Sequence, residues 1–151
     1  MSNKKKVLVV DDHPAFRNSF RKMLAKLPDV GEILEAADGE SAMLMVDQDA
    51  PDLVFMDISM PWLDGIEATR RILRDHPKMK IAMLTIHANQ AFLEKSMEAG
   101  AIGFLDKKSI HEELVQAVEK IVNDETYVSK TMKDSLKPNK HNRRTGGYQN
   151  E

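Results

Sequence analysis

Three acidic side chains follow directly on short apolar runs of the sequence. The adjacent acids Asp11 and Asp12 come after VLVV (7–10), and Asp57 comes after LVFM (53–56). If folding brings these carboxylates together they repel one another, by about 4 kcal/mol for a pair 4 Å apart at an effective dielectric near 20. A hard cation relieves this repulsion, and oxygen ligands of this kind suit Mg²⁺.

A hydroxyl and an ammonium group follow two further apolar runs. Thr85 comes after KIAML (80–84), and Lys107 lies two residues after IGFL (102–105). A phosphoryl group needs such partners, a cation for its charge and a donor for its oxygens. The remaining acid, Asp57, is then the candidate nucleophile, since carboxylates form acyl phosphates. Singly, each residue is more often a strand end, a cap or a solvated side chain; their combination indicates phosphoryl chemistry.

Apolar runs alternate with helical patterns along the chain, and this alternation determines how the polar residues are positioned. Strands are predicted at 6–10, 32–37, 53–56, 80–84 and 102–105. Helices are predicted at 14–27, 40–48, 66–74, 89–99 and 110–123. Five strand–helix pairs of this kind favour an α/β fold, a doubly wound parallel sheet with helices on both faces and right-handed crossovers.

The carboxyl ends of the strands are where such a sheet binds ligands, at the point where the strand order reverses. With the order 2-1-3-4-5, the first and third strands are neighbours. The residues that follow the strands then meet at one edge of the sheet. They are Asp11, Asp12, Asp57, Thr85 and Lys107.

Length and composition narrow the class of protein. The 151 residues fit one domain, with 42% apolar and 30% charged residues. The net charge of −2 creates no general attraction to nucleic acid or membrane. The absence of cysteine excludes disulfides and thiolate metal sites and fits a reducing compartment. No run approaches the roughly 18 apolar residues of a membrane span or the core of a signal peptide, so a cytoplasmic location is expected.

Four stretches of the sequence resemble a known family. They are VLVVDDHPAF, DLVFMDISMPWLDGIEATRRI, AMLTIHA, and AGAIGFLDKKS followed by EEL. Together they resemble the receiver domain of two-component response regulators, over roughly residues 5–128. The DDHP motif and the ending EELVQAVEKIVNDETYVS resemble the NarL/LuxR-like subfamily. The resemblance implies a flavodoxin-like (β/α)5 fold and a role in signal transduction.

The resemblance also implies a phosphoacceptor and a set of metal ligands. Asp57 matches the phosphoacceptor, which is also a metal ligand in this family. Asp12 matches the acid that binds Mg²⁺ directly, and Asp11 the acid that usually acts through water. The backbone carbonyl of Ser59 matches the third protein ligand. His13, beside the acids, is interpreted as an exposed residue at a helix start in preference to a metal ligand.

The same resemblance assigns the residues that respond to the phosphoryl group. Lys107 matches the lysine that pairs with it. Thr85 matches the switch hydroxyl, and Phe104 the aromatic residue that turns inward when the hydroxyl moves. The phosphodonor would be a sensor histidine kinase or a phosphotransfer protein. The chain would catalyse only its own phosphorylation and slow dephosphorylation, and so is not expected to be an enzyme otherwise.

The expected organisation is a receiver domain over residues 1–130 and a flexible polar tail or linker over 131–151. Two readings of the output stay open: a receiver of a transcription regulator whose DNA-binding domain is absent from this chain, or a single-domain regulator acting by protein contact. A homodimer is a third open point, and no direct contact with nucleic acid or membrane is expected. An aspartate-nucleophile phosphatase is disfavoured, because those enzymes resemble one another in having two acids separated by one residue, whereas Asp11 and Asp12 are adjacent.

Overall fold

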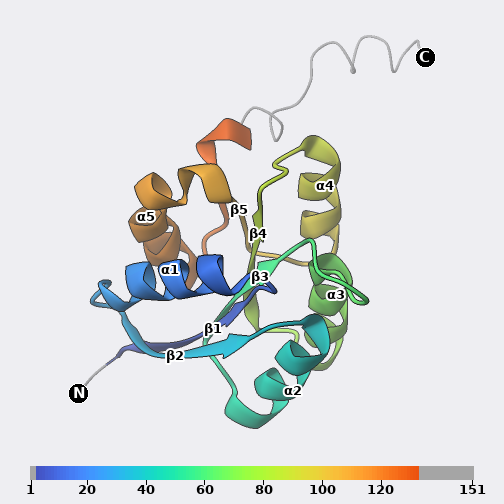
Figure 1. Ribbon diagram of the computed structural model, residues 1–151, viewed down its shortest axis with the longest axis horizontal. Coiled ribbons are helices and arrows are strands. Elements are labelled where there is room, and N and C mark those ends of the chain that lie inside the picture. The colour runs from blue at the N-terminus through green and yellow to red at the C-terminus, as the bar shows by residue number, and fades with distance from the viewer. Residues whose placement is uncertain (1–2, 133–151) are drawn as a thin grey trace.

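The computed structural model describes residues 3–132, which form a six-stranded sheet covered by helices (Figure 1). All neighbouring strands are parallel, and the order is β2-β1-β3-β4-β5-β6. The strands are β1 (Lys5–Val10), β2 (Val30–Ala36), β3 (Leu53–Asp57), β4 (Lys80–Thr85), β5 (Gly103–Asp106) and β6 (Tyr127–Val128). The predicted α/β class and the strand order 2-1-3-4-5 are therefore confirmed, with a sixth strand added at one edge.

Helices cover both faces of this sheet. On one face lie α1 (Pro14–Ala25) and α5 (Ile110–Val122); on the other lie α2 (Gly39–Asp49), α3 (Gly65–Asp75) and α4 (Gln90–Glu98) (Figure 1). A three-residue 3₁₀ turn, η1 (Lys107–Ser109), joins β5 to α5. This layering leaves the carboxyl ends of the central strands at one edge of the sheet, as a doubly wound fold requires.

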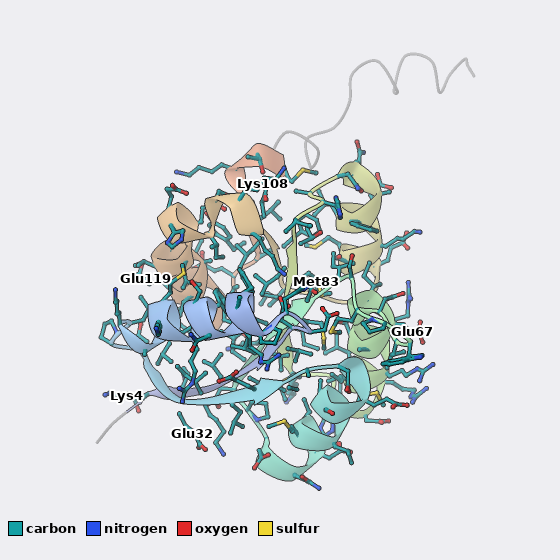
Figure 2. All side chains as sticks on the ribbon, viewed as in Figure 1. Lys4, Glu32, Glu67, Met83, Lys108 and Glu119 are labelled. Carbon is teal, nitrogen blue, oxygen red and sulfur yellow. The ribbon has the colours of Figure 1, made fainter. Side chains whose placement is uncertain are left out.

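The central strands are apolar on both sides because both sides are covered. On β1, Val7 and Val9 pack with α1 and α5, whereas Leu8 and Val10 pack with the other three helices. All four side chains are inaccessible to solvent, and burying each one contributes about 1.5–3 kcal/mol relative to exposure. Figure 2 shows the side chains filling the space around Met83 on β4, with Glu32 and Glu119 at the periphery.

Side-chain caps begin three of the helices. Asp38 accepts a 2.7 Å hydrogen bond from the Ser41 N–H at the start of α2. Asp64 accepts from the Glu67 N–H at the start of α3, and Asn89 accepts from the Phe92 N–H at the start of α4. Such caps satisfy backbone N–H groups that have no partner within the helix, and each is worth about 1 kcal/mol. The loops that lead out of β3 and β4 therefore end at defined residues.

The structure departs from the sequence predictions mainly after α5. The two-residue strand β6 was not predicted, because it is too short to produce a periodic pattern. Met132 is buried and joins the core on the α2–α4 face, so the packed chain extends past the expected boundary at residue 130. The rest of the expected tail, 133–151, lies outside the described residues.

Within residues 3–132, no helix is both long and apolar enough to cross a membrane.

Candidate functional site

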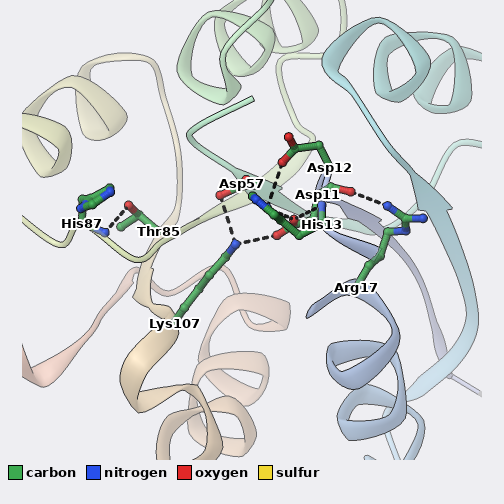
Figure 3. A network of polar contacts seen from close by, with 8 residues as sticks. All are labelled: Asp11, Asp12, His13, Arg17, Asp57, Thr85, His87 and Lys107. Carbon is green, nitrogen blue, oxygen red and sulfur yellow. Dashed lines mark hydrogen bonds and ion pairs between the residues drawn. The ribbon is translucent and has the colours of Figure 1, made fainter. Parts of the chain in front are cut away.

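Three predicted site residues meet at the carboxyl end of the sheet. Asp11 follows β1, Asp57 ends β3 and Lys107 follows β5 (Figure 3). The Lys107 ammonium lies 2.6 Å from Asp11 Oδ2 and 3.3 Å from Asp57 Oδ1. The three side chains are at most 8% exposed. Asp57 and Lys107, which lie 46 and 96 positions after Asp11 in the sequence, thus join Asp11 in one buried ionic cluster.

An aromatic ring of α1 lies beside the lysine. The Lys107 ammonium lies 4.2 Å from the centroid of the Phe16 ring. Phe16 stacks on Phe20, which in turn meets Phe55 of β3 edge to face. A cation–π contact of this kind is worth about 0.5–2 kcal/mol, depending on desolvation. The sequence analysis missed this role of Phe16, since its helical spacing also fits an ordinary core position.

Two buried carboxylates share this one ammonium group, and the pKa of Asp57 reflects it. Burial, followed by the charge of Asp11, raises the pKa of Asp57 to about 6, against the opposing effect of Lys107. Desolvation penalises the charged form, and a neighbouring carboxylate adds to the penalty. The site therefore carries an excess of negative charge that a cation would relieve.

Asp12 and His13 complete the acidic group. His13 Nδ1 lies 3.1 Å from Asp12 Oδ1 and 3.3 Å from Asp11 Oδ1, contacts that are attractive when the ring is protonated. The ring is 69% exposed, which fits the prediction that His13 faces solvent at a helix start. Asp12 Oδ1 is buried and accepts no hydrogen bond within the described part of the chain.

These residues fit a hard divalent cation. One ligand atom from each of Asp11, Asp12, His13 and Asp57 lies within 4.8 Å of the others. The three carboxylates are the ligands that Mg²⁺ prefers, and the buried Oδ1 of Asp12 accepts no hydrogen bond within the described residues. Ser59, whose carbonyl was predicted as a ligand, lines the same cavity of about 280 Å³ as Asp57.

The peptide that follows β1 is held by Arg17, a residue that the sequence analysis did not single out. The Arg17 guanidinium donates a 2.6 Å hydrogen bond to the Asp11 carbonyl oxygen. It also donates to Glu35 of β2 at 2.9 Å. Arg17 thereby ties the loop that carries both acids to α1 and to the neighbouring strand.

A close backbone approach fixes the loop after β3. The Gly65 N–H donates to the Ile58 carbonyl at 2.8 Å. A Cβ atom at position 65 would lie 2.0 Å from the Asp57 carbonyl oxygen, well inside any real contact. Glycine at this position lets α3 begin directly against the backbone of Asp57.

Thr85 and Phe104 do not join the ionic cluster. The Thr85 hydroxyl accepts a 2.9 Å hydrogen bond from the His87 N–H, apart from the lysine (Figure 3). Phe104 is fully buried in the core on the α2–α4 face. The structure gives this one inward position of the ring, so the turn of Phe104 with the Thr85 hydroxyl stays a prediction.

The comparisons with known proteins agree with this geometry. The sequence model of the response regulator receiver domain matches residues 7–119. The chain is 36% identical over 131 residues to response regulator GacA of Pseudomonas aeruginosa, covering 87% of this chain and 61% of the relative. It is 38% identical over 123 residues to response regulator UvrY of Escherichia coli K12, covering 82% of this chain and 56% of the relative.

A solved structure supports the same relationship. The crystal structure of a LuxR-family two-component response regulator from Aurantimonas superposes with a TM-score of 0.85 at 35% identity. The match covers 88% of this chain and 95% of that one. The chain spans 61% of the length of GacA and 56% of the length of UvrY. The match therefore assigns the receiver domain and not the complete activities of these relatives.

Proposed function

Since the chain belongs to the family of response regulator receiver domains, we propose that it accepts a phosphoryl group on Asp57. The donor is a phosphohistidine of a sensor histidine kinase or of a phosphotransfer protein, in the cytoplasm. The observation that carries the proposal is the cluster of Asp57 with Asp11 and Lys107 at the carboxyl end of the sheet.

In the proposed step, a carboxylate oxygen of Asp57 forms a bond to phosphorus while the N–P bond of the phosphohistidine breaks. The leaving imidazole takes a proton, and Asp57 becomes an acyl phosphate. Hydrolysis by water later returns the carboxylate and releases inorganic phosphate. Attack requires the charged form of Asp57, whose pKa of about 6 leaves it mostly ionised at neutral pH.

The residues around Asp57 have separate tasks in this proposal. Asp11, Asp12, Asp57 and the carbonyl of Ser59 would hold Mg²⁺, which would supply charge stabilisation for the transferred oxygens. The Lys107 ammonium, already 3.3 Å from Asp57, pairs with the incoming phosphoryl group. The Thr85 hydroxyl exchanges its contact with the His87 N–H for a phosphoryl oxygen.

We further propose that phosphorylation switches an output surface for transcription regulation. The added charge and acceptor oxygens draw Thr85 and Lys107 toward Asp57, and the packing of α4, β5 and α5 responds. In this proposal Phe104, which is buried here, keeps or takes its inward position as Thr85 moves toward the phosphoryl group. A DNA-binding domain outside this chain, or a contact surface for a second copy or another protein, would receive the change.

Mass spectrometry of the intact protein tests the proposal. The chain is incubated with Mg²⁺ and a small acyl phosphate, beside an Asp57→Asn variant and a sample with chelator. We expect one added phosphoryl group on the wild type and none on the variant or without metal. An unmodified wild type, or a variant that is modified equally, contradicts the proposal.

A further inference from the structure

A second buried carboxylate lies outside the acidic cluster, on α5. Glu113 is 3% exposed. It accepts hydrogen bonds from the Ser109 hydroxyl at 3.0 Å, from the Lys130 N–H at 2.8 Å and from the Ser129 hydroxyl. These donors come from η1 and from the segment after α5, so one carboxylate joins two parts of the chain.

Hydrogen bonds keep Glu113 ionised despite its burial. Burial acts to raise the pKa of Glu113, but the bonds from Ser129, Lys130 and Ser109 outweigh it and hold the pKa below its usual value. Burial and the charge of Glu113 also raise the pKa of Tyr127 to about 12. A buried carboxylate that depends on three donors fixes their positions strongly, because losing any one leaves a charged group under-satisfied.

Asp106 makes a second connection to the same segment. The Asp106 N–H donates to the Ser129 hydroxyl oxygen at 2.8 Å. Its carboxylate caps η1 by accepting from the Lys108 N–H at 2.9 Å, and it accepts from the Thr131 hydroxyl at 3.3 Å. Asp106 directly precedes Lys107 in the sequence. The segment 127–132 is thus tied to the residue before the lysine.

The backbone of Lys107 is consequently held from both sides. Asp106 fixes the entry to η1, and Ser109, bonded to Glu113, fixes its exit. Ser129 connects Asp106 to Glu113, because its hydroxyl donates to Glu113 and accepts from the Asp106 N–H. A three-residue turn has few internal constraints, so these bonds determine where the Lys107 side chain starts on its way to Asp11 and Asp57.

We propose that Glu113 is a positioning residue for Lys107, acting through Ser109 and through the segment 127–132. This segment lies beyond residue 119, where the match to the family model ends. The positioning role does not require that Asp57 be phosphorylated. Its consequence, that the phosphorylation rate depends on the segment 127–132, rests on the proposed function. Because coupling between sites is reciprocal, a phosphoryl group on Asp57 that displaces Lys107 also changes the stability of the contacts that hold the segment 127–132.

Two variants of the full chain test the proposal, each with a matched control. Glu113→Gln places an amide group against the donors of Ser129 and Lys130, and its control is the exposed neighbour Glu112→Gln. Ser129→Ala removes the bridging hydroxyl, and its control is Ser96→Ala, a fully buried hydroxyl without a hydrogen-bond partner in the described residues. Circular dichroism and thermal melts test whether each variant is folded. If Glu113→Gln or Ser129→Ala fails to fold, the milder variant Ser109→Ala replaces it.

The first measurement is the initial rate of phosphorylation by a small acyl phosphate at saturating Mg²⁺. We expect about a tenfold lower rate for Glu113→Gln and Ser129→Ala, because a small displacement of a reacting group is costly. The affinity for Mg²⁺, measured by calorimetry, does not fall, since Asp11 and Asp12 are not moved and a displaced Lys107 competes less with the cation for Asp11. Rates equal to those of the controls, or a parallel loss of Mg²⁺ affinity, overturn the proposal.

The second measurement does not depend on phosphorylation. We expect the NMR signal of the Lys107 side chain to be shifted from that of a solvated lysine, because its ammonium lies 4.2 Å from the Phe16 ring centroid and 2.6 Å from Asp11. In the two variants the signal moves toward that of a solvated lysine, and in the controls it does not. An unmoved signal overturns the positioning role, whereas a wild type that takes up no phosphoryl group refutes the proposed function alone.

Discussion

Lys107 lies closer to Asp11 than to Asp57, at 2.6 Å against 3.3 Å. The lysine therefore contacts both acids, and its shorter contact is with the acid that follows β1, not with the proposed phosphoacceptor. Without a metal ion, its ammonium is the cation that contacts both buried carboxylates in the described chain. A cation bound by Asp11 and Asp12 takes over this task and frees the lysine for a phosphoryl group.

Replacing Lys107 by methionine should destabilise the metal-free protein by about 3–5 kcal/mol, because two buried carboxylates lose their partner. Mg²⁺ should restore part of this loss. Urea denaturation with chelator and with Mg²⁺ measures both effects, and Lys108→Met, at an exposed neighbour, is the control. Equal stability of Lys107→Met and the control would show that the lysine does not neutralise the acids.

An Asp12→Ala variant should be more stable than the wild type in the presence of chelator, because one of three repelling carboxylates is removed. It should also lose the stabilisation by Mg²⁺, which for the wild type is about 2.7 kcal/mol at a hundredfold excess over Kd. Thermal melts with and without metal give both results, with Asp75→Ala as an exposed acidic control. A large loss of stability without metal would make Asp12 a structural residue instead.

The stability of the metal-free protein should depend on pH through Asp57. Its pKa rises from 3.8 to about 6 on folding, so the unfolded chain ionises first and folding becomes less favourable as pH rises between these values. The total change is about 3 kcal/mol. Asp57→Asn lacks this dependence. The difference in unfolding free energy, variant minus wild type, should grow from pH 4 to pH 6 and then level off; a difference independent of pH contradicts the account.

Glu113 should show the opposite pH dependence. Its pKa is lowered from 4.5 on folding, so its contribution is present above pH 4.5 and is lost as the pH falls through the lowered value. Glu113→Gln should be less stable than the wild type at pH 7, with a difference that shrinks in acid. Denaturation curves at several pH values, with Glu112→Gln as control, measure this; a difference that persists at low pH would assign the loss to packing.

A methyl group at position 65 should affect both folding and phosphorylation. In Gly65→Ala the new Cβ meets the Asp57 carbonyl oxygen at 2.0 Å, so the backbone of one of them must move. We expect a loss of about 1–3 kcal/mol, typical of an overpacked site, and slower phosphorylation of Asp57. Gly31→Ala, whose nearest contact is a side-chain carbon at 3.0 Å, is the control. A variant with wild-type stability would mean that α3 shifts freely.

The sequence alone determined the order of the elements. The apolar runs of β1, β3 and β4 are continuous because these strands are covered on both faces, and such runs are readable without a structure. The same pattern shows where each strand ends and which polar residue comes there. The meeting of Asp11, Asp57 and Lys107 was therefore predictable once the strands were ordered. The bounds of the strands and helices differ from the predicted ones by a few residues at most.

The tertiary structure decided the contacts that have no local pattern. The ring of Phe16 beside the lysine, the hydrogen bond from Arg17 to Glu35, and the burial of Glu113 each depend on a partner distant in the chain. A glutamate on an amphipathic helix is ordinarily solvated, whereas Glu113 is buried and bonded to Ser129 and Lys130, which follow β6, and to Ser109. Periodicity reports which face of an element is buried, whereas the partner that a polar group finds there is determined by packing between distant segments.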